Sequence, residues 1–221
     1  MNDKLFCPSL MCADFNHLKD EVERLDQAGT DIFHIDVMDG QFVPNFGMGL
    51  QDIETVRAAT DKPIDVHLMT RNPGEHINLF ADLGVDIIYI HPEADNNALK
   101  TLEKINQRNI KSGIAINPGT SIETVKELLF FVDYVMIMTV HPGFAGQKFL
   151  SFVEEKIDSL IELQPKYNFE IFVDGAISPE KIQILGEKGI KGFVLGTSSL
   201  FNKEESFSEL LNRYRMLEFS K

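Results

Sequence analysis

The chain has 221 residues, 43% of them hydrophobic, and a formal net charge of -13. This length can bury one large core, and no linker rich in Pro, Gly or Ser interrupts it, so we expect a single domain of residues 1–221. The acidic balance argues against nucleic acid or an anionic membrane surface as a partner, because both attract a basic protein face.

The N-terminal residues and the cysteines indicate the compartment. The opening "MNDKLFCPSL" lacks the basic and apolar regions of a signal peptide, and no run approaches the roughly 18 apolar residues of a membrane span. Two neighbouring thiols, Cys7 and Cys12, neither staple a fold nor form a zinc-ribbon pattern. We therefore expect a cytoplasmic protein with reduced, partly buried cysteines.

Short runs rich in apolar and β-branched residues recur along the chain and predict strands. They are "LFCPSLM", "DIFHIDVM", "IDVHLM", "DIIYIHP", "KSGIAIN", "YVMIMTV", "FEIFVDG" and "KGFVLGT". Segments with helical periodicity lie between them. Alternation of strand and helix over eight repeats is typical of β/α units with parallel strands.

Three of the intervening segments carry helix signals. In the first, residues 15–29, Gly29 suits a C-terminal cap, and one face is apolar: Phe15, Leu18, Val22 and Leu25. "TSIETVKELL" opens with Thr120 and Glu123 in capping-box spacing. "SPEKIQILGEKG" offers Ser178 as N-cap, with Pro179 at the first helical position.

Eight β/α units predict an α/β fold, a single (β/α)8 barrel, although about 250 residues is more typical of that fold. A doubly wound open sheet is the alternative. It is disfavoured because no G-x-G-x-x-G follows the first strand, and because polar residues gather at the ends of many strands.

The stretch "HIDVMDG" places unusual residues on one strand face. Since side chains alternate along a strand, His34, Asp36 and Met38 share a face, opposite to Ile35 and Val37. Other strands also end in polar or small residues: Ser9, His67, His91, Asn117, Asp174, Gly196 and Thr197. In a barrel these ends meet at one rim, where active sites are built.

Four of these residues form a candidate metal site. His34, Asp36, His67 and Asp174 offer two imidazoles and two carboxylates, which suit a borderline divalent ion. Ordinary strand-end residues are the alternative, and for any single histidine that interpretation is the better one. For the set of four we predict one divalent ion per chain, with zinc as the first choice and manganese, iron or cobalt as alternatives.

Glycine-bearing loops follow the last three strands. "HPGFAGQKF" breaks the spacing of a nucleotide-binding P-loop, so that motif is rejected. Backbone N–H groups of the three loops, with a short helix at 198–201, could instead hold a phosphate, although a single such loop would be an ordinary turn. Met38, Met69 and Met138 lie near the rim and would line the site, where plain core packing is the default.

Taken together, "PSLMCADF", "HIDVMDGQFVPN", "DVHLM", "HPEA", "MTVHPGFAGQKF", "VDGAI" and "LGTSSLF" resemble the ribulose-phosphate 3-epimerase family over residues 8–201. The resemblance implies a metal-dependent (β/α)8 barrel of the ribulose-phosphate-binding type. Such an enzyme inverts C3 of a phosphorylated ketose, interconverting D-ribulose 5-phosphate and D-xylulose 5-phosphate. It also implies a homo-oligomer, either a dimer or a hexamer.

The resemblance assigns roles to individual residues. The metal ligands would be His34, Asp36, His67 and Asp174, and the acid/base pair would be Asp36 and Asp174, working on opposite faces of a cis-enediolate. The sugar contacts would be Ser9 and His67, and the walls Met38, Met69 and Met138. The phosphate would be held by Gly143, Phe144, Ala145, Gly146, Gly175, Ala176, Gly196 and Thr197.

Three positions depart from the family pattern. Most of the family has Gly-Gly at Ala145-Gly146 and at Gly175-Ala176, and Gly-Ser at Gly196-Thr197. These departures are closer to the D-allulose-6-phosphate 3-epimerase branch, so that activity is the alternative. A decarboxylase of the orotidine-phosphate type is disfavoured because "HIDVMDG" lacks the required lysine. A non-catalytic sugar-phosphate-binding barrel stays open.

Overall fold

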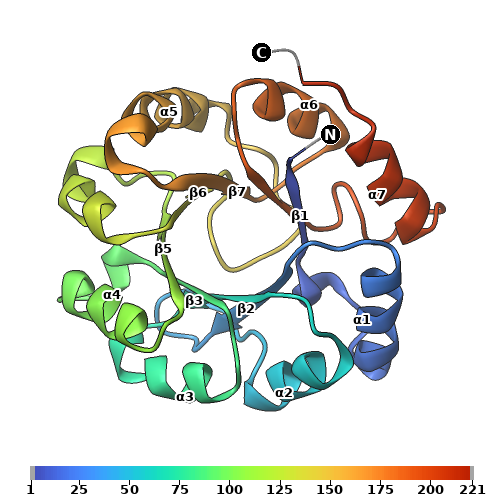
Figure 1. Cartoon of the computed structure of the whole chain (residues 1–221), viewed down its shortest axis with the longest axis horizontal. Helices are drawn as coiled ribbons and strands as arrows, with labels where there is room; N and C mark the ends of the chain where they lie inside the picture. The colour runs from blue at the N-terminus through green and yellow to red at the C-terminus, as the bar shows by residue number, and fades with distance from the viewer. Residues whose placement is uncertain (1–2, 220–221) are drawn as a thin grey trace.

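The computed structural model describes residues 3–219, so residues 1–2 and 220–221 of the expected domain lie outside the described part. Within this range a ring of parallel strands is surrounded by helices (Figure 1). The strands are β1 Leu5–Pro8, β2 Phe33–Met38, β3 Ile64–Met69, β4 Ile87–Ile90, β5 Lys111–Ile116, β6 Tyr134–Met138, β7 Glu170–Asp174 and β8 Gly192–Leu195. The predicted (β/α)8 barrel is confirmed, and each predicted run contains one strand.

The ring closes between β1 and β2 through a few contacts, among them hydrogen bonds between Phe6 and Asp31. Neighbouring strands pair in the order β1-β8-β7-β6-β5-β4-β3-β2, and a parallel bridge between Ser9 and His34 joins the two ends. The carboxyl ends of all these strands therefore surround one mouth, where the polar strand-end residues can meet.

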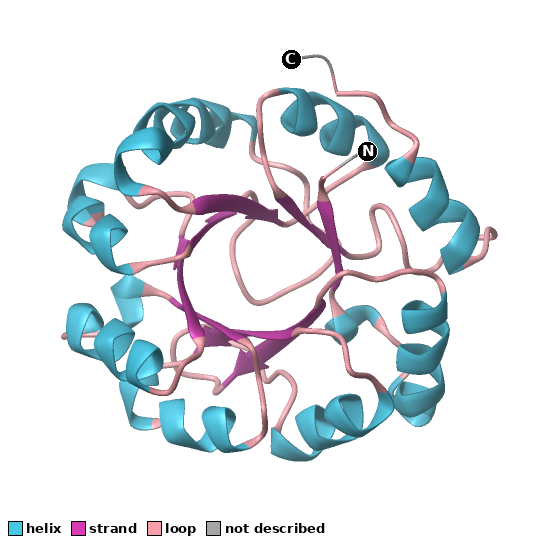
Figure 2. Cartoon of the chain, viewed as in Figure 1, coloured by secondary structure: helices cyan, strands magenta, loops and turns pink. Residues whose placement is uncertain are grey.

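The helices form the outer layer (Figure 2). They are α1 Leu18–Gln27, α2 Leu50–Ala59, α3 Ile77–Asp82, α4 Ala98–Gln107, α5 Glu154–Tyr167, α6 Pro179–Glu187 and α7 Phe207–Arg215. Short 3-10 helices are η1 Leu10–Cys12, η2 Phe15–His17, η3 Pro73–Glu75, η4 Pro92–Ala94, η5 Ile122–Thr124, η6 Lys126–Phe131 and η7 Ser151–Val153. No helix in residues 3–219 combines the length and the apolar character that crossing a bilayer demands.

Two of the three helix signals are confirmed. At α6 the Ser178 hydroxyl accepts from the Lys181 N–H at 3.2 Å, and Pro179 is the first helical residue. In α1 the apolar face is buried from Leu18 onward. Phe15 is the exception, because it belongs to η2 and its side chain is exposed.

The prediction of an α-helix after β5 is wrong. This segment forms η5 and η6 instead of one α-helix, and Ser121 caps the first of them by accepting from the Glu123 N–H. The Thr120 hydroxyl is engaged elsewhere, because it donates to Glu93 Oε1 at 2.5 Å. A tertiary contact has therefore replaced the local cap.

The core has two layers, one on each face of the barrel wall. Ile35 and Val37 point outward and pack in the layer beneath the helices. The barrel interior is filled mainly by the side chains of Cys7, Ile87, Tyr89, Ala115, Met136, Phe172 and Val194. Because this interior is packed, a substrate can approach only from a rim. Cys7 is buried and Cys12 partly so, both as free thiols, as predicted.

Candidate active site

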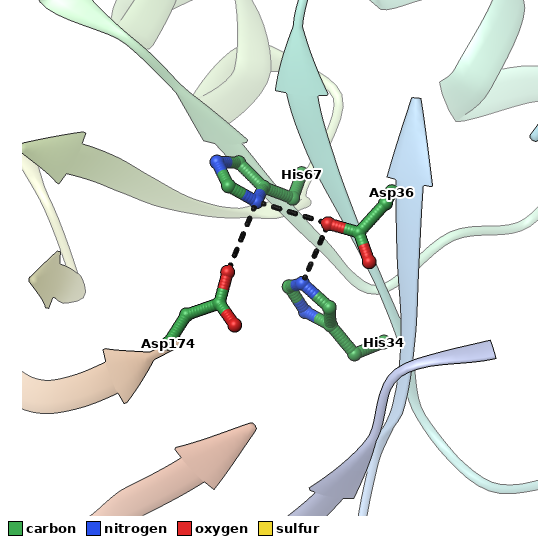
Figure 3. A group of neighbouring side chains, drawn as sticks. All are labelled: His34, Asp36, His67 and Asp174. Carbon is green, nitrogen blue, oxygen red and sulfur yellow. Dashed lines mark ion pairs between the residues drawn. The ribbon is translucent and has the colours of Figure 1, made fainter. Parts of the chain in front are cut away.

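Strand register brings the candidate metal ligands together. On β2 and β3, Asp36 lies opposite His67, His34 opposite Asp65, and Met38 opposite Met69. Asp174 ends β7, three strands away round the ring, and points toward the same centre (Figure 3).

The four side chains form a buried cluster. One ligand atom from each lies within 4.8 Å of all the others. Asp36 Oδ1 is 3.4 Å from His34 Nε2 and 3.3 Å from His67 Nδ1, which is 3.7 Å from Asp174 Oδ2. Ligand atoms about 2.1 Å from a tetrahedral ion would be roughly 3.4 Å apart, so the spacing suits such an ion.

Unsatisfied ring nitrogens support the same interpretation. His34 Nε2 and His67 Nδ1 are buried and have no hydrogen-bond partner among the described residues; the same holds for His34 Nδ1 and His91 Nδ1, but only the first two face the carboxylates of the cluster. Buried polar atoms in proteins are normally satisfied, so two orphaned nitrogens beside two carboxylates fit the ligand set of a divalent cation. The geometry does not identify the ion.

The two carboxyl groups differ in their affinity for a proton. Burial opposes the charge of Asp36, but His34 and His67 outweigh it and hold the pKa of Asp36 well below its ordinary value. The Ser9 hydroxyl also donates to Asp36 Oδ2 at 2.7 Å. Burial, together with the negative charge of Asp36, raises the pKa of Asp174 to about 6. Such divergent pairs are typical of acid/base sites.

Each histidine of the cluster has a buried neighbour on its other side. His34 Nδ1 is 2.5 Å from Asp65 Oδ1. Burial alone would lower the pKa of His34, but the charges of Asp65 and Asp36 raise it well above its ordinary value. His67 Nε2 is 2.8 Å from Nε2 of His91, whose pKa burial lowers to about 4.

Asp65 was not predicted from the sequence, although a signal was present. Asp65 precedes His67 by two residues in "IDVHLM", so strand alternation places both on the interior face. His91 was recognised as a strand-end residue, but its contact with His67 was not foreseen. That contact depends on the relative heights of β3 and β4, which sequence does not reveal.

A pocket opens onto the cluster at the carboxyl end of the barrel. Its lining includes Ser9, Asp36, Asp174 and the three predicted methionines, Met38, Met69 and Met138. All the predicted phosphate-loop residues also line it. His67 does not, because its side chain is completely buried behind the pocket. Sequence reasoning missed Met11, Cys12, His141 and Gln147, which contribute to the lining, whereas Ser198, expected to begin a short helix at the phosphate, does line the pocket.

The loop after β7 has a backbone that restricts its residues. Gly175 has φ +115°, and a Cβ atom there would lie 2.4 Å from the Val140 side chain, so only glycine fits. Ala176 follows at φ +52°, which is unusual for a residue with a side chain. Two successive left-handed residues turn the chain sharply at the pocket.

The loops after β6 and β8 are held in place by different hydrogen bonds. Asn45, in the loop after β2, donates its side-chain amide to the Gly143 carbonyl at 2.7 Å and so ties the β6 loop to the opposite side of the mouth. The prediction of a short helix at 198–201 is wrong. That segment is a turn, closed by the Leu200 N–H donating to the Gly196 carbonyl at 2.9 Å.

Sequence comparison identifies relatives along almost the whole chain. The model of the ribulose-phosphate 3 epimerase family matches residues 5–201. Ribulose-phosphate 3-epimerase of Helicobacter pylori strain J99 is 40% identical over 203 residues, covering 91% of this chain and 93% of the relative. The Bacillus subtilis enzyme of that name is 38% identical over 194 residues, covering 86% and 89%.

Comparison of structures shows the same barrel in distant proteins. KGPDC from Streptococcus mutans has a TM-score of 0.75 at 14% identity, covering 97% of this chain and 99% of that one. Tryptophan synthase subunit alpha from Campylobacter jejuni has a TM-score of 0.65 at 16% identity, covering 98% and 96%. At these identities the likeness establishes the fold alone.

Proposed function

The chain belongs to the ribulose-phosphate 3-epimerase family, which makes it an isomerase, and we propose that it interconverts D-ribulose 5-phosphate and D-xylulose 5-phosphate. One observation carries the proposal. Asp36 and Asp174 reach the same pocket from strands three apart round the barrel, beside two buried histidines. Inversion at a carbon requires two such groups, one for each face.

The proposed mechanism uses two bases. A proton next to a carbonyl is removed from one face of C3, which leaves a flat cis-enediolate, and another proton is returned on the opposite face. Asp36 and Asp174 would each serve one face. Ser9 holds Asp36 through Oδ2, so that Oδ1 faces the histidines.

The candidate ligands His34, Asp36, His67 and Asp174 would hold one divalent ion, with zinc as the first choice. Such an ion would supply the positive charge that stabilises the enediolate oxygens. Because the carboxylates would also serve as the bases, ligation would keep both of them deprotonated until substrate arrives.

The opposite part of the pocket suits a phosphate. Among residues 3–219, no lysine or arginine lines the pocket. We therefore infer that backbone N–H groups of the loops after β6, β7 and β8 hold the anion. Met38, Met69 and Met138 form apolar walls that keep water away from the enediolate.

The second candidate activity is epimerisation of D-allulose 6-phosphate to D-fructose 6-phosphate. The observation in its favour is that Ala145 and Ala176, which depart from the family pattern, both line the pocket. A non-catalytic sugar-phosphate-binding barrel is the more distant alternative. The homo-oligomeric state and the cytoplasmic location stay predictions.

Solvent exchange tests these possibilities together. In deuterium oxide, D-ribulose 5-phosphate and D-allulose 6-phosphate are incubated side by side with the enzyme, and deuterium at C3 is followed by NMR. We expect faster exchange and epimerisation with the pentulose. Faster reaction of the hexulose would establish the second candidate activity. If neither substrate exchanged its C3 proton, the non-catalytic sugar-phosphate-binding barrel would be the remaining interpretation.

Metal content tests the ion separately. Purified protein should carry about one divalent ion per chain, and His34→Ala and His67→Ala should each lose it because a tetrahedral set needs all four ligands. Stoichiometric metal in both variants would contradict the assigned ligands, whatever the activity.

A further inference from the structure

A line of polar side chains leads away from the four candidate metal ligands, across the ends of β4 and β5. His67 turns Nδ1 toward Asp36 and Asp174, and its other ring nitrogen faces away from them (Figure 3). That second nitrogen, Nε2, is 2.8 Å from His91 Nε2. On the far side of the His91 ring, Nδ1 is 3.6 Å from Glu93 Oε2.

The far end of this line is fixed by several groups. Glu93 Oε1 accepts from the Asn117 backbone N–H at 3.0 Å and from the Thr120 hydroxyl at 2.5 Å. Lys156, on α5, donates to the carbonyls of Asn117 at 2.7 Å and Pro118 at 2.8 Å. The carboxylate that faces His91 is therefore held by the loop after β5, which is itself fastened to a helix.

The hydrogen bonds determine where the protons lie. Two ring nitrogens 2.8 Å apart share one proton, so one ring donates and the other accepts. If His67 offers the lone pair of Nδ1 to an ion, its proton is on Nε2, and His91 must accept. His91 then carries its own proton on Nδ1, which faces the Glu93 carboxylate.

The opposite arrangement is unfavourable at both ends. If His91 donated through Nε2, neutral His67 would carry its proton on Nδ1 and present no lone pair to the cluster. Neutral His91 would then turn the lone pair of Nδ1 toward the Glu93 carboxylate, so two acceptors would face each other. The first arrangement instead turns an N–H toward the carboxylate, a favourable electrostatic contact across 3.6 Å, although that spacing is too long for a hydrogen bond.

We propose that His91 is a positioning residue. It accepts a hydrogen bond from His67 Nε2 and, with Glu93 beside it, keeps the Nδ1 lone pair of His67 directed at the candidate metal site. The proposal rests on the metal site of the proposed function. The two ligand histidines would then be oriented differently, His34 by the Asp65 carboxylate and His67 by a neutral imidazole. Hydrogen-bond partners of this kind commonly affect metal affinity about 10- to 100-fold.

Packing alone is the competing explanation. The Phe42 ring centroid lies 4.8 Å from that of His91, so His91 also fills space. A spectroscopic measurement on the unaltered protein separates the two. In ¹⁵N-labelled metal-free protein we expect a scalar coupling across the hydrogen bond between the two Nε2 atoms, with the proton bonded to His67. Absence of the coupling, or a proton bonded to His91 Nε2, would overturn the proposal.

Zinc affinity provides the second test, by competition with a chromogenic chelator. His91→Phe keeps a flat ring but removes the acceptor, and we expect zinc to bind about 10- to 100-fold more weakly. His91→Gln offers an amide oxygen near the position of Nε2, so affinity should return to within about threefold of wild type. His17→Gln, which alters an exposed histidine before α1, is the control and should bind as wild type does.

The outcomes separate the two proposals. Equal zinc affinity in wild type and folded His91→Phe overturns the positioning role and leaves the metal site intact. If wild-type protein binds no zinc, the metal site fails and the positioning role fails with it. If His91→Phe does not fold, the coupling in wild type and the affinity of His91→Gln decide.

Discussion

The two sides of the barrel mouth are built by different means. On the β2–β3 side, charged side chains stand on strands, are almost completely buried, and are aligned by strand register. On the β6–β8 side, glycine-bearing loops surround the pocket, and no lysine or arginine from residues 3–219 lines it. In the proposed mechanism, proton transfer would depend on side chains and anion binding on the backbone.

Asp174 joins these two sides. It ends β7 next to the loop that begins with Gly175, yet its carboxylate faces His67 and Asp36 (Figure 3). Its side chain is 16% exposed, against 4% for Asp36, so it is the more accessible of the two proposed bases. The difference predicts that substitutions on the two sides will change different kinetic constants.

The largest effect should come from the carboxylates themselves. Asp36→Asn or Asp174→Asn should each lower kcat by about 10²- to 10⁴-fold in metal-loaded protein, because each removes one acid/base group. Solvent exchange should become one-sided. With Asp174→Asn only one epimer should exchange its C3 proton, and with Asp36→Asn only the other.

Metal content must be measured for both variants, since both residues are proposed ligands. If metal-loaded Asp174→Asn still epimerises within about tenfold of wild type, a loss of only ~1.4 kcal/mol, the two-base mechanism is wrong.

The next effect concerns the stability of metal-free protein. The folded-state pKa of Asp174, about 6, lies above its ordinary value of 3.8. Its contribution to stability is therefore complete below about pH 4 and is lost as the pH rises through 6. With 1.36 kcal/mol for each pH unit, the loss amounts to ~3 kcal/mol.

Asp174→Asn isolates this contribution because asparagine imitates the protonated acid. In urea unfolding of metal-free protein at pH 7.5, the variant should be more stable than wild type by ~3 kcal/mol, with little difference near pH 4. Added zinc should reverse the order at pH 7.5 by stabilising the wild type. An equal difference at both pH values would refute the pKa assignment.

A smaller effect tests the side of the mouth made of loops. A Cβ at Gly196 would be 3.5 Å from Cys12 Sγ, an ordinary contact, so a Cβ atom can be added there without a clash. Gly196→Asp should raise KM more than tenfold by repelling the phosphate, while kcat and metal content stay unchanged. Gly196→Ala is the matched control and should change KM little. An unchanged KM in Gly196→Asp would place the phosphate elsewhere.

The smallest effect returns to the β2–β3 side. Ser9→Ala removes the hydrogen bond to Asp36 Oδ2 but no ligand and no base. We expect kcat/KM to fall about three- to tenfold, less than the full loss of a hydrogen bond to a charged group would cause, because water partly replaces the hydroxyl. A decrease beyond a hundredfold would indicate that Ser9 takes part in proton transfer itself.

Sequence reasoning succeeded where chemistry follows strand periodicity. His34, Asp36 and His67 could be placed on interior faces because alternation with period two is a local property. The same rule would have identified Asp65. Thr120 shows where local signals fail, since its hydroxyl caps no helix and instead binds Glu93. The His67–His91 contact likewise depends on how neighbouring strands are offset, which only the folded barrel determines.

The place where β1 and β2 close the barrel lies next to the candidate active site, so the site affects how firmly the barrel is held closed. β2 and β3 pair over six residues, whereas β1 and β2 are joined by the bridge at Ser9 and His34 and, below it, by two hydrogen bonds between Phe6 and Asp31. Beside the bridge, the Ser9 hydroxyl donates to Asp36, so groups of the candidate active site reinforce a seam that has few backbone hydrogen bonds. An ion held by β2, β3 and β7 would brace this seam from within. Stripping the ion should therefore loosen the barrel there first, so that amide hydrogens of β1 and β2 exchange with solvent sooner than those of β4 and β5.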